Sequence, residues 1–159
     1  MANTASLCTS FLSELLTGTH NFGVAPIRAA TTADTFKAAL YLTGTGSVDA
    51  STTAYTATGE VSGTNYTAGG VTVTNATAPA STNTSSTAGT AYWTPSASVS
   101  YTNVTLTTAF NAMLLYNSTQ SNKAVGVYTF GSQTITAGTF ALTMPSNTTS
   151  TALLRIATT

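Results

Sequence analysis

Charged side chains are scarce in this chain of 159 residues, which has four basic and four acidic residues and a formal net charge of zero. They make up 5% of the sequence, whereas typical soluble domains carry about 25%. The eight charges are scattered singly, so no basic patch is available to follow a phosphate backbone, and we expect no nucleic-acid partner. A neutral surface also lacks the repulsion that keeps proteins apart in solution, which suits a protein packed into an assembly.

Metal-ligating and nucleophilic residues are equally rare. The single cysteine, Cys8, excludes an internal disulfide framework, and the single histidine, His20, is expected to be a hydrogen-bonded surface or packing residue. The acidic residues are too dispersed for a zinc site or a calcium loop, and Asp34 is explained by Asx-turn bonding before a strand. No serine lies in Gly-X-Ser-X-Gly. The sequence therefore predicts no catalytic residue, no metal, no cofactor and no enzyme.

Long apolar runs are missing too, so we expect no membrane-spanning segment. The chain is instead rich in threonine, which supplies about a quarter of the residues, and 42% of its residues are hydrophobic. The length suits one domain with a substantial core. Threonine is β-branched and favours a pleated backbone, while its hydroxyl keeps a strand face wet without charge. This composition predicts strands with one dry face and one neutral, polar face.

The one segment with helical periodicity spans residues 5–16. Leu7, Phe11 and Leu15 recur at helical spacing and form one apolar face, and Gly18 stands where a helix commonly ends. Two interpretations are open: this helix covers one end of the domain, or it is an arm that docks onto a neighbouring subunit.

From Asp34 onward the apolar period changes to two. The pattern predicts eight short strands, with loops at 44–58 and 75–89 and a turn-rich piece at 131–138. The expected strands span 35–42, 67–74, 91–94, 98–106, 110–116, 124–130, 140–145 and 152–156. The predicted fold is an all-β antiparallel β-sandwich, with the jelly roll as one form of it, over residues 34–159. A helix and arm occupy residues 1–33.

The segment at 114–131 has the strongest hairpin pattern, two apolar strands joined by a polar loop at 117–122. Alternation assigns Met113, Leu115, Val125 and Val127 to the core. Aromatic residues such as Trp93 are expected in the core or at a subunit interface, with stacking on a bound sugar as the alternative.

Several segments, taken in order, resemble small structural proteins of tailed-bacteriophage particles. They are FLSELLTGTHNF (11–22), DTFKAALY (34–41), EVSGTNYTAGG (60–70), the hairpin at 114–131, and LLRIA (153–157). The resemblance implies a capsid decoration (cement) protein on the virion surface, bound to the major capsid protein as a homodimer or homotrimer. A tail, neck or fibre component is the first alternative, and a glycan-binding attachment module is the second.

A decoration protein binds a repeating lattice, so weak contacts gain strength through multivalency. The predicted helix and the segment after it are the expected capsid-facing anchor. The candidate partner-binding residues are Leu7, Phe11, Leu15, Phe22 and Ile27.

Overall fold

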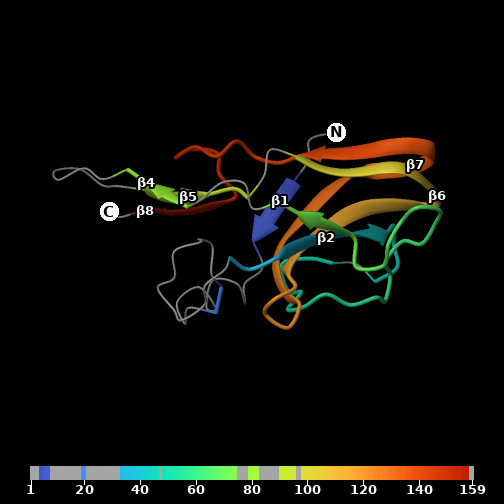
Figure 1. The fold of residues 1–159 in the computed structure, drawn as a ribbon, viewed down its shortest axis with the longest axis horizontal. Helices are drawn as coiled ribbons and strands as arrows, with labels where there is room; N and C mark the ends of the chain where they lie inside the picture. The colour runs from blue at the N-terminus through green and yellow to red at the C-terminus, as the bar shows by residue number, and fades with distance from the viewer. Residues whose placement is uncertain are drawn as a thin grey trace.

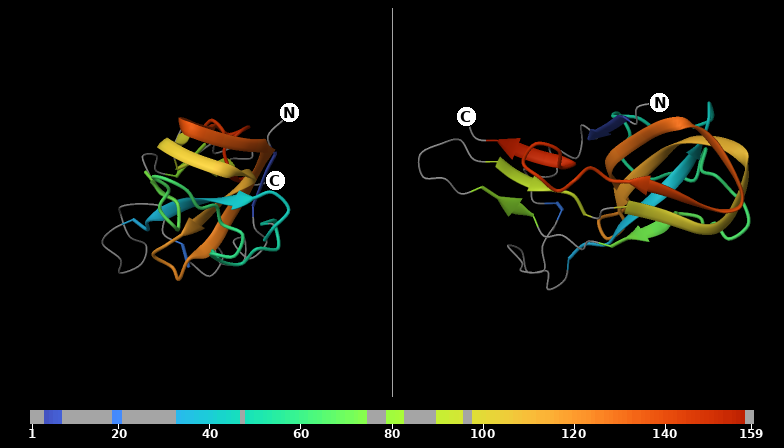
Figure 2. Two further views of the ribbon diagram at one scale, coloured as in Figure 1. Left: turned by 90° about the vertical axis from the view of Figure 1, so that its right-hand side faces the viewer. Right: turned by 90° about the horizontal axis from the view of Figure 1, so that it is seen from above.

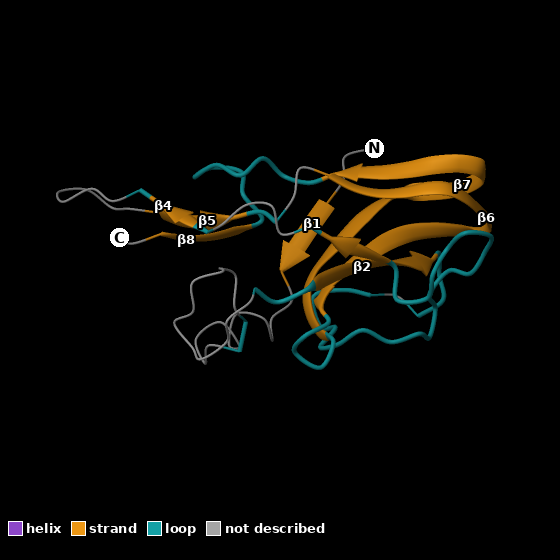
Figure 3. Ribbon diagram, in the orientation of Figure 1, coloured by secondary structure: helices purple, strands orange, loops and turns teal. Residues whose placement is uncertain are grey.

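A computed structural model describes residues 4–7, 19–20, 33–46, 48–74, 79–82, 90–95 and 98–157. This part of the chain is all β, without a helix (Figure 3). Its eight strands are β1 (Thr4–Leu7), β2 (Phe36–Leu42), β3 (Val71–Val73), β4 (Ala80–Ser81), β5 (Thr90–Trp93), β6 (Ser98–Asn117), β7 (Lys123–Thr143) and β8 (Leu154–Ala157). The all-β prediction is confirmed.

The strands form two antiparallel sheets. The larger has five strands in the order β1-β7-β6-β2-β3, and the smaller has three in the order β4-β5-β8 (Figure 1). Figure 2 shows the small sheet at one end of the long axis and the curved β6–β7 ribbon at the other. The two sheets meet where the ring of Trp93 in β5 packs on that of Phe36 in β2, with centroids 5.4 Å apart.

The hairpin predicted at 114–131 is confirmed, and its strands are much longer than expected. β6 has 20 residues and β7 has 21. They are joined at Gln120–Lys123, where Ser121 and Asn122 both have positive φ and the Lys123 amide donates to the Gln120 carbonyl. Two successive positive φ angles define a type I′ turn, whose twist matches that of the paired strands.

The ribbon curls over β2 instead of running straight (Figures 1 and 2). Register shifts interrupt the β6–β7 ladder at several points between Tyr101 and Ala112, and such bulges bend a strand and increase its twist. The hydroxyl of Tyr101 consequently reaches the Ala38 carbonyl of β2 and donates a hydrogen bond of 2.8 Å. The expectation of a turn-rich piece at 131–138 is wrong: these residues continue β7, because they pair with β6 across the interrupted ladder.

The core lies inside this curl. Its largest fully buried side chains are Trp93, Tyr41, Tyr101, Phe36, Phe110, Leu40, Leu106, Met113, Leu114, Leu115 and Val104. Met113, Leu115, Val125 and Val127 are buried as predicted. Neighbours such as Leu114 are buried as well, because the loop before Glu60 covers the second face of the sheet, where Tyr55 stacks on Tyr116 with centroids 4.8 Å apart.

The helix predicted from residue 5 is not supported. Thr4–Leu7 form β1, whose register pairs Thr4 with Thr129 and Leu7 with Gly126 of β7, while residues 8–18 lie outside the described residues. Helical spacing is a weak signal beside an open strand edge, which offers a row of main-chain groups for pairing. β1 joins the large sheet across the expected boundary at residue 33, and that boundary stays a prediction.

Candidate functional site

A buried polar cluster lies at the base of the β6–β7 turn, around Asn117. This side chain is fully buried, and its amide nitrogen donates to Oδ2 of Asp34 at 2.8 Å and to Nδ1 of His20 at 2.9 Å. Its Oδ1 accepts the amides of Thr119 and Gln120, both at 3.1 Å. Because an amide nitrogen can only donate, Nδ1 of His20 is the acceptor here and carries no proton.

The cluster fixes the turn to the strand before β2. Asp34 also accepts a 3.2 Å hydrogen bond from Gln120 Nε2 through Oδ1. Its hydrogen bonds therefore reach residues more than 80 positions away in sequence, where a local Asx turn was expected. His20 is 7% exposed and is a packed, hydrogen-bonded residue, as predicted. The imidazole of His20 and the carboxylate of Asp34 are thus both held by hydrogen bonds to Asn117 in a structural network.

Glu60 organises a second cluster, which fastens the long loop to the sheet. Its Oε2 accepts the Tyr55 hydroxyl at 2.7 Å, and its Oε1 accepts the Tyr66 hydroxyl at 2.8 Å and the Gly69 amide at 2.7 Å. Burial, more than any other cause, raises the pKa of Tyr66 well above its ordinary value. The phenols of Tyr55 and Tyr66 stay protonated and donate hydrogen bonds to Glu60, which hold the long loop against the sheet.

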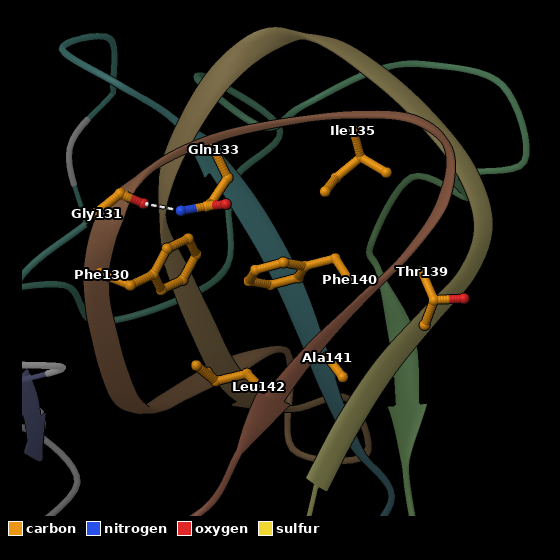
Figure 4. A pocket seen from close by; sticks show the side chains of 8 residues that line it. All are labelled: Phe130, Gly131, Gln133, Ile135, Thr139, Phe140, Ala141 and Leu142. Atoms are coloured by element: carbon orange, nitrogen blue, oxygen red, sulfur yellow. Dashed lines mark hydrogen bonds between the residues drawn. The ribbon is translucent and has the colours of Figure 1, made fainter. Parts of the chain in front are cut away.

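A pocket of about 430 Å³ lies in the curl of β7 (Figure 4). It is lined by Phe130, Gly131, Gln133, Ile135, Thr139, Phe140, Ala141 and Leu142, all from this strand. Figure 4 shows the two phenylalanine rings together with Leu142 and Ile135, and the ring centroids lie 5.1 Å apart. The Gln133 side chain donates to the Gly131 carbonyl at 3.1 Å. Apolar side chains and polar groups contribute about equally to the surface of this pocket.

The bend of β7 creates this pocket. Phe140 also packs edge-on against the buried Phe110, with centroids 5.1 Å apart, which anchors one wall in the core. Phe130, Ile135 and Phe140 remain half-buried. The outer edge of residues 131–143 has no partner strand in the part of the chain that the structure describes. A concavity with apolar side chains in its wall thus lies beside this edge.

A second pocket, of about 360 Å³, lies between β3 and the first residues of β6. Polar and apolar groups also contribute about equally to its lining, which comprises Lys37, Asn65, Tyr66, Thr67, Gly70, Val71, Thr72, Ser100, Tyr101, Thr102 and Val104. The rings of Tyr66 and Tyr101 stack in its wall at 6.0 Å. Such a mixture of aromatic, hydroxyl and amide groups is suited to a neutral polar ligand.

Neither pocket was expected from the sequence. Of the candidate partner-binding residues, Leu7 ends β1 and is paired with Gly126. Phe11, Leu15, Phe22 and Ile27 lie outside the described residues, and their role stays a prediction. A usable signal for the β7 pocket was the pair Phe130 and Phe140, two large apolar residues flanking a Gly/Thr-rich stretch.

Within the described ranges, no three histidine, cysteine or acidic residues gather where they could hold a metal ion. These ranges also contain no helix of sufficient length and hydrophobicity to cross a membrane. No family model matches the chain, and no curated protein or solved structure is significantly similar to it. Function must therefore be argued from the arrangement of the molecule.

Proposed function

We propose that this chain is a structural protein of a tailed-phage particle, a capsid decoration protein that binds the major capsid protein lattice. The proposal rests on the ordered resemblance and on one structural observation. The small β4-β5-β8 sheet stands out from the large sheet and is fastened at its base by Trp93. A projecting three-stranded sheet with open edges is suited to contacts with other subunits.

The remaining chemistry of the described residues supports a scaffold. His20, Asp34 and Glu60 form hydrogen bonds that hold the β6–β7 turn and the long loop in place. The net charge of zero gives neighbouring copies no reason to repel one another. A subunit that covers a lattice needs neutral contact surfaces, and the scarcity of charged residues supports this part of the proposal.

The proposal includes a two-layer sandwich. One layer is β2 with the adjoining halves of β6 and β7, and the other is the far half of the same ribbon, folded over the first. The Tyr101 hydrogen bond to Ala38 and the edge-on contact of Phe110 with Phe140 support this arrangement. The jelly roll stays one candidate form of this sandwich.

Cryo-EM of particles purified from the source of the chain tests the proposal. Density that fits the curled ribbon and projecting sheet at icosahedral positions of the head is the expected result. Density restricted to the tail or neck would refute decoration in favour of a tail, neck or fibre component. Absence of the chain from purified particles would refute any virion role.

The pocket beside Tyr66 favours one second candidate, a glycan-binding attachment module. The half-buried ring of Tyr66, which is backed by the buried Tyr101, and the hydroxyl groups of the wall resemble the mixed surface on which neutral sugars bind. A glycan array probed with the folded protein distinguishes the two functions. Binding that is lost in Ser100→Trp, which would fill the pocket, supports the glycan module, and an array without signal eliminates it.

A further inference from the structure

One exposed side chain stands out on the small sheet. Ile156 of β8 is 54% exposed and is the one large hydrophobic side chain classed as exposed among the described residues. Its neighbour two residues back, Leu154, is buried and registers with Trp93, whereas Ile156 registers with Ala91. Residues two apart share a face of a strand. The apolar face that seals the core at Leu154 therefore continues outward to Ile156.

The β7 pocket lies at the other end of the molecule. Phe130, Ile135 and Phe140 supply apolar surface in its wall, polar groups supply a similar share, and no charged residue lines it. Its volume of about 430 Å³ exceeds what one isoleucine side chain fills. Figure 1 shows β8 and the bend of the β6–β7 ribbon at opposite ends of the long axis. Ile156 cannot reach the pocket of its own chain, but it can reach that of a second copy.

The main-chain amides and carbonyls at the outer edges of β8 and β7 can add hydrogen bonds to this contact. β8 is an edge strand of the small sheet, and the outer edge of β7 beyond Phe130 has no partner strand within the described ranges. An open edge presents unpaired amides and carbonyls that a further strand can join. Two open edges, one beside the exposed isoleucine and one beside the pocket, can pair in the same encounter.

We propose that copies of this chain associate head to tail, with β8 of one copy along β7 of the next and Ile156 in the β7 pocket. The contact joins two different surfaces, so a pair of copies still has one free Ile156 and one free β7 pocket, and the assembly can grow into a ring or a filament. This inference deepens the proposed function by naming a self-contact through which copies on a lattice reinforce one another.

Two single variants and their mixture test the geometry by sedimentation velocity. Ile156→Asp removes the apolar side chain of β8 and leaves the β7 pocket intact. Thr139→Trp fills the β7 pocket from an exposed lining position and leaves Ile156 intact. The full-length wild-type chain is expected to self-associate as its concentration rises. Each variant alone should associate at least about tenfold more weakly. An equimolar mixture should form a 1:1 pair that does not grow, because its free ends are the disabled ones.

Controls keep the outcomes interpretable. Thr134→Trp adds the same ring at an exposed β7 position outside the pocket, and Ile156→Val keeps an apolar side chain at position 156. Both variants should therefore associate like wild type. Circular dichroism spectra and melting curves must match for all variants. Wild-type association by Ile156→Asp, a monomeric wild type, or a mixture that stays monomeric would each overturn the head-to-tail contact. Finding the chain on phage heads would then still support the proposed function, because that test does not depend on self-association.

Discussion

Gly70→Ala is expected to be strongly destabilising, because a side chain has no room at this position. Gly70 precedes β3 with φ +73°, and an added Cβ would lie 1.6 Å from the Ala38 carbonyl oxygen and 2.7 Å from Cα of Ala39. That carbonyl also accepts the 2.8 Å hydrogen bond from Tyr101. β2 therefore cannot move away from position 70 without losing the bond that holds the curled ribbon over it.

Gly44→Ala is the matched control. Gly44 has nearly the same φ, +75°, but nothing lies within 4 Å of an added Cβ. Alanine at a left-handed φ costs about 1–2 kcal/mol at either position. At Gly70, overpacking adds about 1–3 kcal/mol and loss of the tyrosine hydrogen bond about 1 kcal/mol, for a total of about 3–6 kcal/mol.

Thermal and urea denaturation followed by far-UV circular dichroism measure this difference. For a chain of this size, Tm falls by about 2–4 °C per kcal/mol, so Gly70→Ala should melt at least about 4 °C below Gly44→Ala. Equal melting temperatures for the two variants would refute the close approach of residue 70 to β2.

Three further predictions concern buried polar groups. Tyr128→Phe removes a buried hydroxyl that has no hydrogen-bond partner in the described part of the chain. The free energy of unfolding should therefore rise by about 1 kcal/mol, measured as a higher urea midpoint. A fall of that size in the free energy of unfolding would show that the hydroxyl has a partner. Asn117→Asp places an acceptor 2.8 Å from an Asp34 oxygen and should cost about 2–4 kcal/mol at pH 7 but less at pH 4, where the introduced carboxyl can take a proton; a pH-independent cost would contradict this. Burial raises the pKa of Tyr41 to about 12. Because the unfolded phenol titrates near pH 10, its contribution is complete below about pH 10 and is lost toward pH 12, so urea midpoints should fall in that window as tyrosinate absorbance at 295 nm rises; constant midpoints would argue against a buried phenol.

Strand type and the central hairpin could be predicted because local pattern determines both. The alternation around Leu115 and Val127 and the polar turn between them define a hairpin without reference to the rest of the chain. The covering of the second face could not be predicted, since it depends on Tyr55, about 60 residues from its stacking partner Tyr116.

The helix predicted from residue 5 is not supported, because residues 5–7 form a strand for a physical reason. Leu7, at helical distance from Phe11, also fits a strand, and the open edge at Gly126–Thr129 of β7 decides between the two. The β7 pocket was missed because it needs a bend. Residues 131–138 look like a turn in sequence, and the ladder to β6 shows that they are a bulged strand whose concave side is walled by Phe130 and Phe140. Long-range pairing, which sequence periodicity does not encode, determines both features.

The sheet order has a consequence for how the chain folds during synthesis. β1 and β2 are made early, yet their main partners are β7 and β6, which are the last strands of the large sheet to emerge from the ribosome. In the large sheet, the β2–β3 pair can form before the ribbon appears, and it spans three residue pairs. Contacts this distant in sequence fold slowly, whereas a hairpin closed by a tight turn forms in about 1–10 μs. The β6–β7 ribbon is therefore the expected nucleus, and the first half of the chain has to wait for it.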